Sequence, residues 1–316
     1  MLNQIKGLHH VTSMASSAPQ NNAFWTKTLG LRRVKQTVNF DEPSVYHLYY
    51  GDEAGTPGSV MTYFPFPHIV RGRPGAGEVG TTVLSVPEGS LSFWEQKLAA
   101  EGVKDLRTDE SFGQKRLHFA GPDGDGLALV EDKNDVRAAW THGGVSADAA
   151  IRGFHSASLR LRDAGATEEL LKFMGYEVAQ THGDIKRMVI KGGNGADFVD
   201  LETLPGAPVA GLGAGSVHHI AFAVPTKADQ LEVRRQLIDT GYNLTPVIDR
   251  DYFFSVYFRT PGGVLFEIAT AGPGFQVDEL QQQLGQALKL PPQFEEDRAA
   301  IEKALPPITL DLGKYQ

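Results

Sequence analysis

The stretch S-V-H-H-I-A-F-A-V-P, at residues 216–225, decides how the rest of this chain can be organised. Its β-branched and aromatic residues lie between a glycine and a proline, which is typical of a β-strand. A similar stretch, L-H-H-V-T-S-M, lies near the start of the chain, at residues 8–14. A doubled histidine inside a strand at both ends of one sequence indicates a structural unit that is used more than once.

A pattern of one strand, one helix and three further strands recurs four times along the chain. Each predicted helix ends next to a glycine, and Gly- and Pro-containing turns separate the strands. Internal repetition of a supersecondary unit is strong evidence about architecture. We therefore predict an α+β fold in which four βαβββ units form curved mixed sheets. The first strands of the four units are predicted at residues 7–14, 81–86, 154–162 and 217–224, and the helices at 21–29, 90–101, 166–174 and 227–240.

The order of the units predicts two domains followed by a tail. Residues 1–145 contain the first two units, and residues 146–273 contain the third and fourth. Residues 274–316 form a C-terminal helical tail, with helical spacing at 277–288 and 293–305. Because terminal segments that dock are held for stability, we expect this tail to cap an open sheet end or to contact a second subunit.

Composition and charge exclude several classes of protein. The net charge of −8 and the absence of a long basic run argue against a nucleic-acid or membrane-surface partner. The chain has no cysteine, which excludes disulfides and thiolate metal sites. Neither a signal peptide nor an apolar stretch long enough to span a membrane is recognisable. With 41% hydrophobic residues the chain can bury a sizeable core, and we expect a cytoplasmic protein.

Two histidines and one glutamate, all in predicted strands, are the candidate metal ligands. His10 and His219 hold the same place in the first and last units. Glu267 lies in the apolar strand V-L-F-E-I-A, where an unpaired carboxylate would cost several kcal/mol, so a bound cation explains it best. Such a 2-His-1-carboxylate set leaves positions open on non-haem Fe(II) for oxygen and substrate. Alternation of side chains along the strand places Leu8 and Thr12 on the face of His10.

Several long segments carry a family resemblance. They are H-H-V-T in the first unit, H-H-I-A-F-A-V-P in the fourth, R-T-P-G-G-V-L-F-E at 259–267, Y-H-L-Y-Y-G-D-E-A-G-T-P-G-S-V-M-T at 46–62 and R-G-F-H-S at 152–156. With the repeated βαβββ unit, they resemble the vicinal-oxygen-chelate (glyoxalase-like) superfamily. More narrowly, the chain is similar to the ring-cleaving dioxygenases of the hydroquinone and chlorohydroquinone 1,2-dioxygenase branch. The resemblance covers almost the whole chain and implies the glyoxalase/extradiol dioxygenase fold.

The resemblance also implies a metal, a substrate and a set of site residues. The metal would be Fe(II), or Mn(II), and the substrates O2 and a hydroquinone-like or catechol-like aromatic diol. A homodimer is expected from the family. Strict alternation turns the first histidine of each pair away from the metal, so it reaches the site only if its strand bends. The implied metal ligands are His10, His219 and Glu267, and the implied catalytic and substrate-handling residues are His9, Thr12, His218, Arg250 and Tyr257.

Alternatives stay open for both the ligands and the function. Catechol extradiol enzymes of the superfamily take their ligands from the third and fourth units, so His155 in G-F-H-S-A-S could replace His10. A glyoxalase-like isomerase or lyase would use the same site with Ni, Zn or Mn, and a non-catalytic member would only bind a small molecule. The isomerases need a further glutamate, which S-V-M-T-Y-F at 59–64 lacks, and this favours oxygen chemistry. The second and third units lack two paired histidines, so a site around Glu131, Asp200 or Glu202 is predicted to have decayed.

Overall fold

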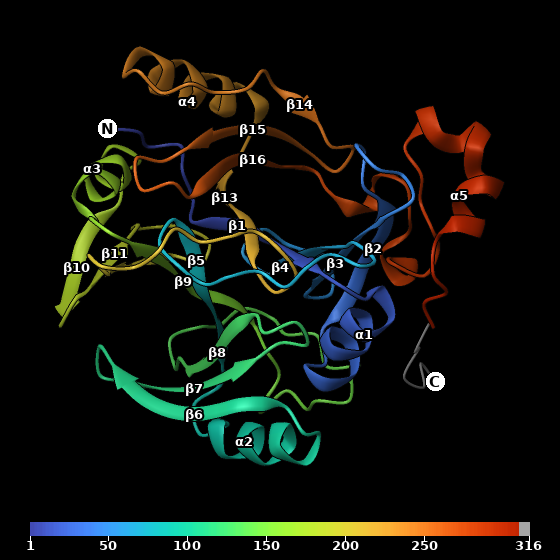
Figure 1. Cartoon of the computed structure of the whole chain (residues 1–316), viewed down its shortest axis with the longest axis horizontal. Helices are drawn as coiled ribbons and strands as arrows, with labels where there is room; N and C mark the ends of the chain where they lie inside the picture. The colour runs from blue at the N-terminus through green and yellow to red at the C-terminus, as the bar shows by residue number, and fades with distance from the viewer. Residues whose placement is uncertain (310–316) are drawn as a thin grey trace.

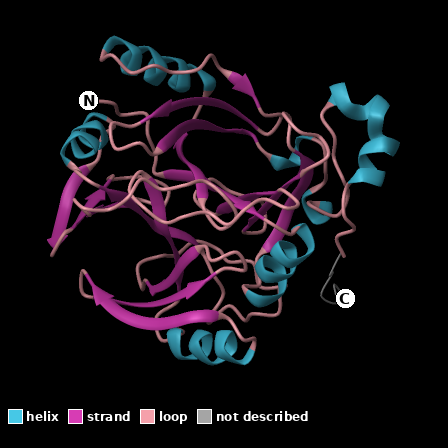
Figure 2. Ribbon diagram, in the orientation of Figure 1, coloured by secondary structure: helices cyan, strands magenta, loops and turns pink. Residues whose placement is uncertain are grey.

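The computed structural model describes residues 1–309, and strands make up most of its interior while the helices lie at the periphery (Figure 2). All four predicted units are present, with their elements in the predicted order. The first unit contains β1 (Leu8–Ala15), α1 (Ala18–Ala23), the π-helical η1 (Phe24–Thr28), β2 (Arg32–Val38), β3 (Tyr46–Gly51) and β4 (Val60–Pro65). The second contains β5 (Glu78–Val86), α2 (Leu91–Ala100), β6 (Lys104–Ser111), β7 (Gln114–Ala120) and β8 (Gly126–Glu131).

The third and fourth units repeat this order of elements. The third contains β9 (Gly153–Leu161), α3 (Gly165–Phe173), β10 (Glu177–His182), β11 (Ile185–Val189) and β12 (Phe198–Thr203). The fourth contains β13 (Val217–Val224), α4 (Lys227–Asp239), β14 (Ile248–Asp249), β15 (Phe253–Arg259) and β16 (Leu265–Pro273).

The units combine into two eight-stranded sheets. The first sheet has the order β14-β15-β16-β13-β1-β4-β3-β2 and therefore joins the first unit to the fourth (Figure 1). The second sheet has the order β10-β11-β12-β9-β5-β8-β7-β6 and joins the second unit to the third. In both sheets the two units meet through an antiparallel pair, β1 with β13 and β5 with β9. Each sheet thus takes one unit from each predicted domain, and the domain boundaries themselves stay a prediction.

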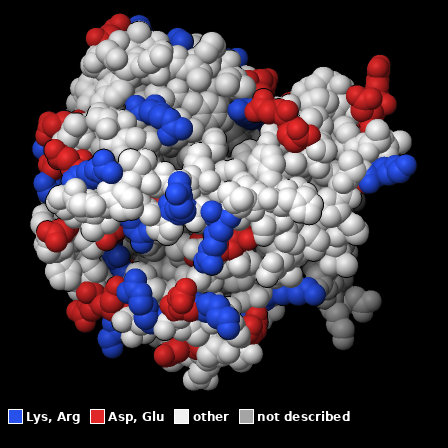
Figure 3. Space-filling view, in the orientation of Figure 1, with Lys and Arg blue, Asp and Glu red and all other residues white. Residues whose placement is uncertain are grey.

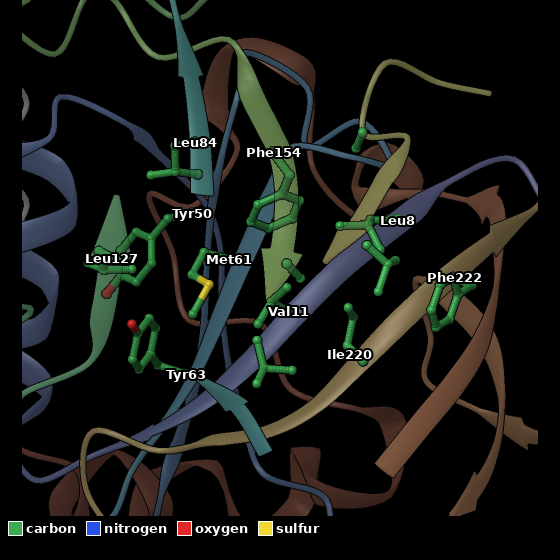
Figure 4. Packing of buried hydrophobic residues seen from close by; sticks show 14 of the residues in the cluster. Leu8, Val11, Tyr50, Met61, Tyr63, Leu84, Leu127, Phe154, Ile220 and Phe222 are labelled. Carbon is green, nitrogen blue, oxygen red and sulfur yellow. The ribbon is translucent and has the colours of Figure 1, made fainter. Parts of the chain in front are cut away.

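A continuous apolar core contains residues from both sheets. Figure 4 shows Val11 and Ile220 of the first sheet packed near Phe154 of the second, and all three belong to one buried cluster. At about 25 cal/mol for each Å² of apolar surface buried, such a cluster is the main source of the fold's stability. The opposite face of the first sheet is a concave surface, and a separate apolar cluster that includes Ala221 and Phe253 lines it. We call this surface the first cup.

Two β-bulges interrupt the β1–β13 pair, and they decide which side chains face the first cup. One is at His9, because Leu8 and His10 pair with consecutive residues of β13. The other is at His218, which lies between partners of consecutive β1 residues. A bulge adds one residue to its strand and re-aims the side chains that follow. Leu8 therefore joins the core with Val11 (Figure 4), so the prediction that it shares the face of His10 was wrong.

The C-terminal tail is less helical than predicted. At the segment predicted as the first helix there are only short 3₁₀ turns, η2 (Phe275–Val277), which ends where the segment begins, and η3 (Gln281–Gln283). The second predicted segment matches η4 (Pro292–Asp297) and α5 (Arg298–Ala304) to within one residue at each end. Two arginines of β2 explain the difference: Arg32 donates to the carbonyl of Gln281, and Arg33 donates to the carbonyl of Gly285. These bonds hold carbonyls that an α-helix would use for itself. The last predicted tail residues, 310–316, lie outside the described residues.

The surface carries charges of both signs. On the face shown in Figure 3, basic and acidic side chains are interspersed rather than separated into one large basic field. Within residues 1–309, no helix combines the length and the apolar composition that crossing a membrane requires.

Candidate metal centre

The two histidines and the glutamate predicted as metal ligands meet in the first cup. His10 comes from β1, His219 from β13 and Glu267 from β16, and all three are buried. Nε2 of His10 lies 3.2 Å from Nε2 of His219, and these two atoms lie 3.1 and 2.9 Å from Oε2 of Glu267. Among residues 1–309 this is the one group of His, Cys, Asp and Glu side chains whose donor atoms could converge on a metal ion.

The triangle formed by these three atoms fits an octahedral ion. For metal–ligand bonds of about 2.1 Å, neighbouring ligands lie about 3.0 Å apart around an octahedral ion and about 3.4 Å apart around a tetrahedral one. The observed sides of 2.9, 3.1 and 3.2 Å match the octahedral value. Three ligands on one octahedral face leave the opposite three positions free for other molecules.

His9 fixes which nitrogen of His10 faces the centre of the triangle. The ring of His9 is neutral, because burial, followed by the neighbouring His10, lowers its pKa to about 3. Its Nε2 lies 3.0 Å from the carbonyl oxygen of Thr270, which can only accept, so Nε2 carries the hydrogen. Nδ1 of His9 is then an acceptor for Nδ1–H of His10, at 2.9 Å. This leaves the lone pair of His10 Nε2 directed at the site, as metal-binding histidines require.

His218 and His219 repeat this contact at the other bulge. Their Nδ1 atoms lie 2.8 Å apart. Burial, followed by the neighbouring His219, lowers the pKa of His218 to about 4, and burial lowers the pKa of His219. His9 and His218, the first histidine of each pair, therefore reach the site because a β-bulge bends each strand. Strict alternation of side chains does not include such a bulge. The structure brings together His9, His10, His218, His219 and Glu267.

The carboxylate of Glu267 has one oxygen with a donor and one without. Oε1 accepts a hydrogen bond from the hydroxyl of Ser255, whereas Oε2 has no hydrogen-bond partner. A buried carboxylate oxygen that lies beside two imidazole nitrogens without a hydrogen-bond donor is unfavourable unless a cation lies between them. The donor set and this unpartnered oxygen therefore fit a divalent ion.

A cavity of about 200 Å³ opens over the triangle. An apolar cavity of about 150 Å³ is enough to hold benzene, so one substituted aromatic ring fits here. The flat side chains on its walls suit an aromatic ring, because offset and edge-to-face ring contacts are favourable. The cavity is lined by His10, Met14, Asn39, Phe40, Asp41, His47, Tyr49, Phe64, Phe66, His218, His219, Arg250, Phe253 and Tyr257.

Arg250 and Tyr257, whose role in handling a substrate stays a prediction, lie together on the cavity wall. Nε of Arg250 is 3.4 Å from the hydroxyl of Tyr257, and its guanidinium also lies over the ring of Phe40. Tyr257 pairs with Glu267 across β15 and β16, and its ring makes an edge contact with His219. Burial raises the pKa of Tyr257, so its phenol keeps its hydrogen and can donate it.

Thr12 leads to three residues that the sequence analysis did not single out as site residues. Its hydroxyl lies 2.9 Å from that of Thr62, which in turn lies 2.9 Å from Nε2 of His47. Nδ1 of His47 lies 2.8 Å from the hydroxyl of Tyr49. The signal available in the sequence was the spacing in Y-H-L-Y-Y, because residues two apart on a strand share a face.

His155 does not belong to the first cup. It lies on β9 of the second sheet, where its ring stacks on Phe198 and its Nε2 lies 3.4 Å from Nε2 of Gln114. The alternative ligand set, in which His155 replaces His10, is therefore wrong, because the structure does not bring His155 to the other two ligands.

Comparison with known proteins gives the class to which this fold and this site belong. The model of the Glyoxalase/Bleomycin resistance protein/Dioxygenase superfamily matches residues 85–268. A solved structure of a "putative dioxygenase" from Bacillus subtilis superposes with a TM-score of 0.94 and 41% identity, covering 98% of this chain and 99% of the other. The chain therefore belongs to the Glyoxalase/Bleomycin resistance protein/Dioxygenase superfamily.

Two curated relatives match over nearly their whole length. One is "Putative ring-cleaving dioxygenase MhqO" of Bacillus subtilis, 42% identical over 308 residues, which cover 97% of this chain and 98% of the relative. The other is the chlorohydroquinone/hydroquinone 1,2-dioxygenase of Sphingobium indicum, 36% identical over 305 residues, which cover 92% and 93%.

Proposed function

We propose that this chain is an Fe(II)-dependent dioxygenase that opens the ring of a dihydroxylated aromatic compound, with a hydroquinone-like molecule as the preferred substrate. The observation that carries the proposal is the facial triangle of His10, His219 and Glu267 at the base of an aromatic-lined cavity. The names of the relatives, which are 36 to 42% identical, support ring cleavage as the reaction. Mn(II) is the alternative ion for the same ligands.

The bound ion would lower the pKa of a substrate hydroxyl and provide adjacent positions at which the diol and O2 meet. The residues of the chain prepare the rest of the site. His9 holds His10 in the tautomer that directs Nε2 inward, and Ser255 holds Oε1 of Glu267. Because these contacts are preformed, little reorganisation is needed when ion and substrate bind.

The cavity walls orient the ring. Phe253 packs against both histidines of the first pair, with ring centroids 5.1 Å from His9 and 5.0 Å from His10. Arg250 and Tyr257 are the donors for a substrate oxygen that does not contact the ion. Both oxygen atoms of O2 enter the product, so the reaction consumes no external reductant.

The proposal is tested with metal-free protein that is loaded anaerobically with Fe(II), and in parallel with Mn(II). Hydroquinone, catechol and the hemithioacetal of methylglyoxal and glutathione are then supplied in turn, with and without O2. We expect uptake of one O2 for each diol consumed, and both atoms of ¹⁸O2 in the product. Turnover of the hemithioacetal without O2 would instead identify an isomerase, and binding without turnover would identify a non-catalytic member. A homodimer remains a prediction, which the mass in solution tests.

A further inference from the structure

Four side chains form one continuous hydrogen-bonded chain along the wall of the first cup. The order is Thr12, Thr62, His47 and Tyr49, and the successive distances are 2.9, 2.9 and 2.8 Å. We call these four residues the hydroxyl–imidazole chain. Thr12 and Thr62 are fully buried, and Tyr49 is almost fully buried.

The strand register explains why these side chains meet. Thr62 pairs with Thr12 across the parallel strands β1 and β4, and with Tyr49 across the antiparallel strands β3 and β4. His47 is two residues before Tyr49 and therefore shares its face. The rings of Tyr49 and Phe64 lie 4.1 and 4.2 Å from the ring of His47, on which they pack and which they hold in place.

The hydroxyl–imidazole chain can carry a proton without acquiring a net charge. Burial, followed by the neighbouring His10, lowers the pKa of His47 well below its ordinary value, so its ring is neutral, with one donor and one acceptor nitrogen. In one arrangement Thr12 donates to Thr62, Thr62 donates to Nε2 of His47, and Nδ1–H donates to Tyr49. In the other arrangement every donor and acceptor is reversed. A concerted shift between the two moves a proton equivalent from one end to the other.

The two ends of the hydroxyl–imidazole chain lie in different surroundings. Thr12 is two residues after His10 and pairs with His219, so it lies beside the proposed metal ligands. His47 and Tyr49 line the cavity itself. The chain therefore connects the base of the cup to its wall.

The second sheet lacks this arrangement at the same register positions. There the pair Val83–Ala128 replaces Thr12–Thr62, because β5 and β8 pair as β1 and β4 do. Across β7 and β8, His118 is the partner of Ala128, as Tyr49 is of Thr62. With an alanine and a valine at two of the four positions, no such connection forms. The hydroxyl–imidazole chain thus accompanies the metal ligands and is not a general feature of the repeated fold.

We propose that the hydroxyl–imidazole chain is a proton relay for the diol, with His47 as its central positioning residue. This inference rests on the proposed function. The O–H bond of the substrate breaks and Thr12 Oγ1 accepts the proton, while the Thr12 proton passes to Thr62 and the Thr62 proton to Nε2 of His47. The Nδ1 proton passes to Tyr49, and the Tyr49 proton passes to water in the cavity. The reverse sequence returns a proton to the cup before the product leaves.

The relay makes a prediction for the metal-free protein that does not depend on activity. Thr62→Val removes the partner of His47 Nε2, so the hydrogen should move to Nδ1, where Tyr49 accepts it. Tyr49→Phe removes the partner of Nδ1, so the hydrogen should move to Nε2. The ¹⁵N chemical shifts of His47 report both tautomers. We expect the ¹⁵N chemical shifts of His47 to change in opposite directions in the two variants. Unchanged shifts, or shifts in the same direction, would show that the four side chains are not connected as proposed.

Turnover of the iron-loaded protein tests the relay itself. We expect Thr62→Val to lower kcat by about 100-fold, because general acid–base assistance contributes about 10² to 10⁴ in rate. KM and bound iron should stay within about twofold of wild type, Thr62→Ser should restore most of kcat, and the solvent deuterium isotope effect on kcat should differ between wild type and Thr62→Val. Unchanged kcat and isotope effect in Thr62→Val would overturn the proposal.

Thr82 provides the matched control for the threonine-to-valine change. It is a buried strand threonine of the second sheet, and its hydroxyl has no hydrogen-bond partner. Thr82→Val should leave kcat and the isotope effect unchanged, and an equal loss in this variant would attribute the Thr62 effect to general repacking. If wild-type protein does not oxidise any diol, the proposed function fails, whereas the tautomer shifts still decide whether the hydroxyl–imidazole chain is connected.

Discussion

The two sheets share one backbone plan but use their concave faces differently. In both central strand pairs the bulges fall at matching places: at His9 and His218 in the first sheet, and at Gly80 and His155 in the second. We call the concave face of the second sheet the second cup. Because the registers match, each candidate ligand position of the first cup has a counterpart there. Thr81 takes the position of His10, Ser156 that of His219 and Asp200 that of Glu267.

The residue opposite the acid makes the difference between the two cups. Arg187 pairs with Asp200 across β11 and β12, just as Tyr257 pairs with Glu267 across β15 and β16. The guanidinium of Arg187 binds both carboxylate oxygens, at 2.7 and 2.8 Å, and Arg116 approaches one of them at 3.3 Å. The carboxylate of Asp200 in the second cup is therefore neutralised by arginines of the chain itself. The carboxylate of Glu267 in the first cup keeps one oxygen available for a metal ion. The prediction of a decayed site around Asp200 agrees with this geometry.

The largest difference between the cups should appear when equivalent positions are changed. We expect His10→Ala to abolish iron binding and ring cleavage, because one of three ligands is lost, whereas Thr81→Ala should leave both unchanged. Iron per chain and O2 uptake measure the two effects. Loss of iron in Thr81→Ala, or its retention in His10→Ala, would remove the distinction between the cups.

Stability should respond in the opposite way to changes of the two acids. Asp200→Asn leaves two buried arginines without a counter-charge, so we expect the free energy of unfolding to fall by about 3 to 5 kcal/mol. In metal-free protein, Glu267→Gln removes a buried carboxylate with an unpartnered oxygen, so its unfolding free energy should change by less than about 1 kcal/mol or rise. Urea unfolding of both variants measures this, and equal losses would contradict the account.

Sequence was sufficient for the repeat and for the three residues that converge as candidate metal ligands, because both depend on local signals. Glycine and proline boundaries defined the four units, and Glu267 was conspicuous as a carboxylate in an apolar strand. The bulge at His9 could not be predicted, because it arises from pairing with a strand that lies some two hundred residues away. The helix predicted at 277–288 failed for a similar reason, since distant arginines of β2 bind its carbonyls.

The smallest expected effect concerns pH and the second cup. Burial, followed by the nearby Arg187 and Arg116, lowers the pKa of His155 well below its ordinary 6.5. The unfolded chain then binds a proton below pH 6.5 that the folded chain does not, so the stabilising contribution of His155 is present above that pH and is lost as the pH falls.

Between pH 7.5 and 5.5 this single residue should reduce the unfolding free energy by about 1.4 kcal/mol. In His155→Asn, the loss of unfolding free energy between the two pH values should be smaller than in the wild type by this contribution of His155. Urea unfolding at both pH values can measure the difference. An identical pH dependence in both proteins would show that His155 is not held neutral.

The central claim is that the two ends of the repeat array hold one ion between them. The most direct measurement is an anomalous difference map, recorded at the iron edge, from crystals grown with anaerobic Fe(II). We expect one peak per chain, about 2.1 Å from Nε2 of His10, Nε2 of His219 and Oε2 of Glu267. A peak in the second cup, or none at this triangle in a fully loaded crystal, would contradict the account.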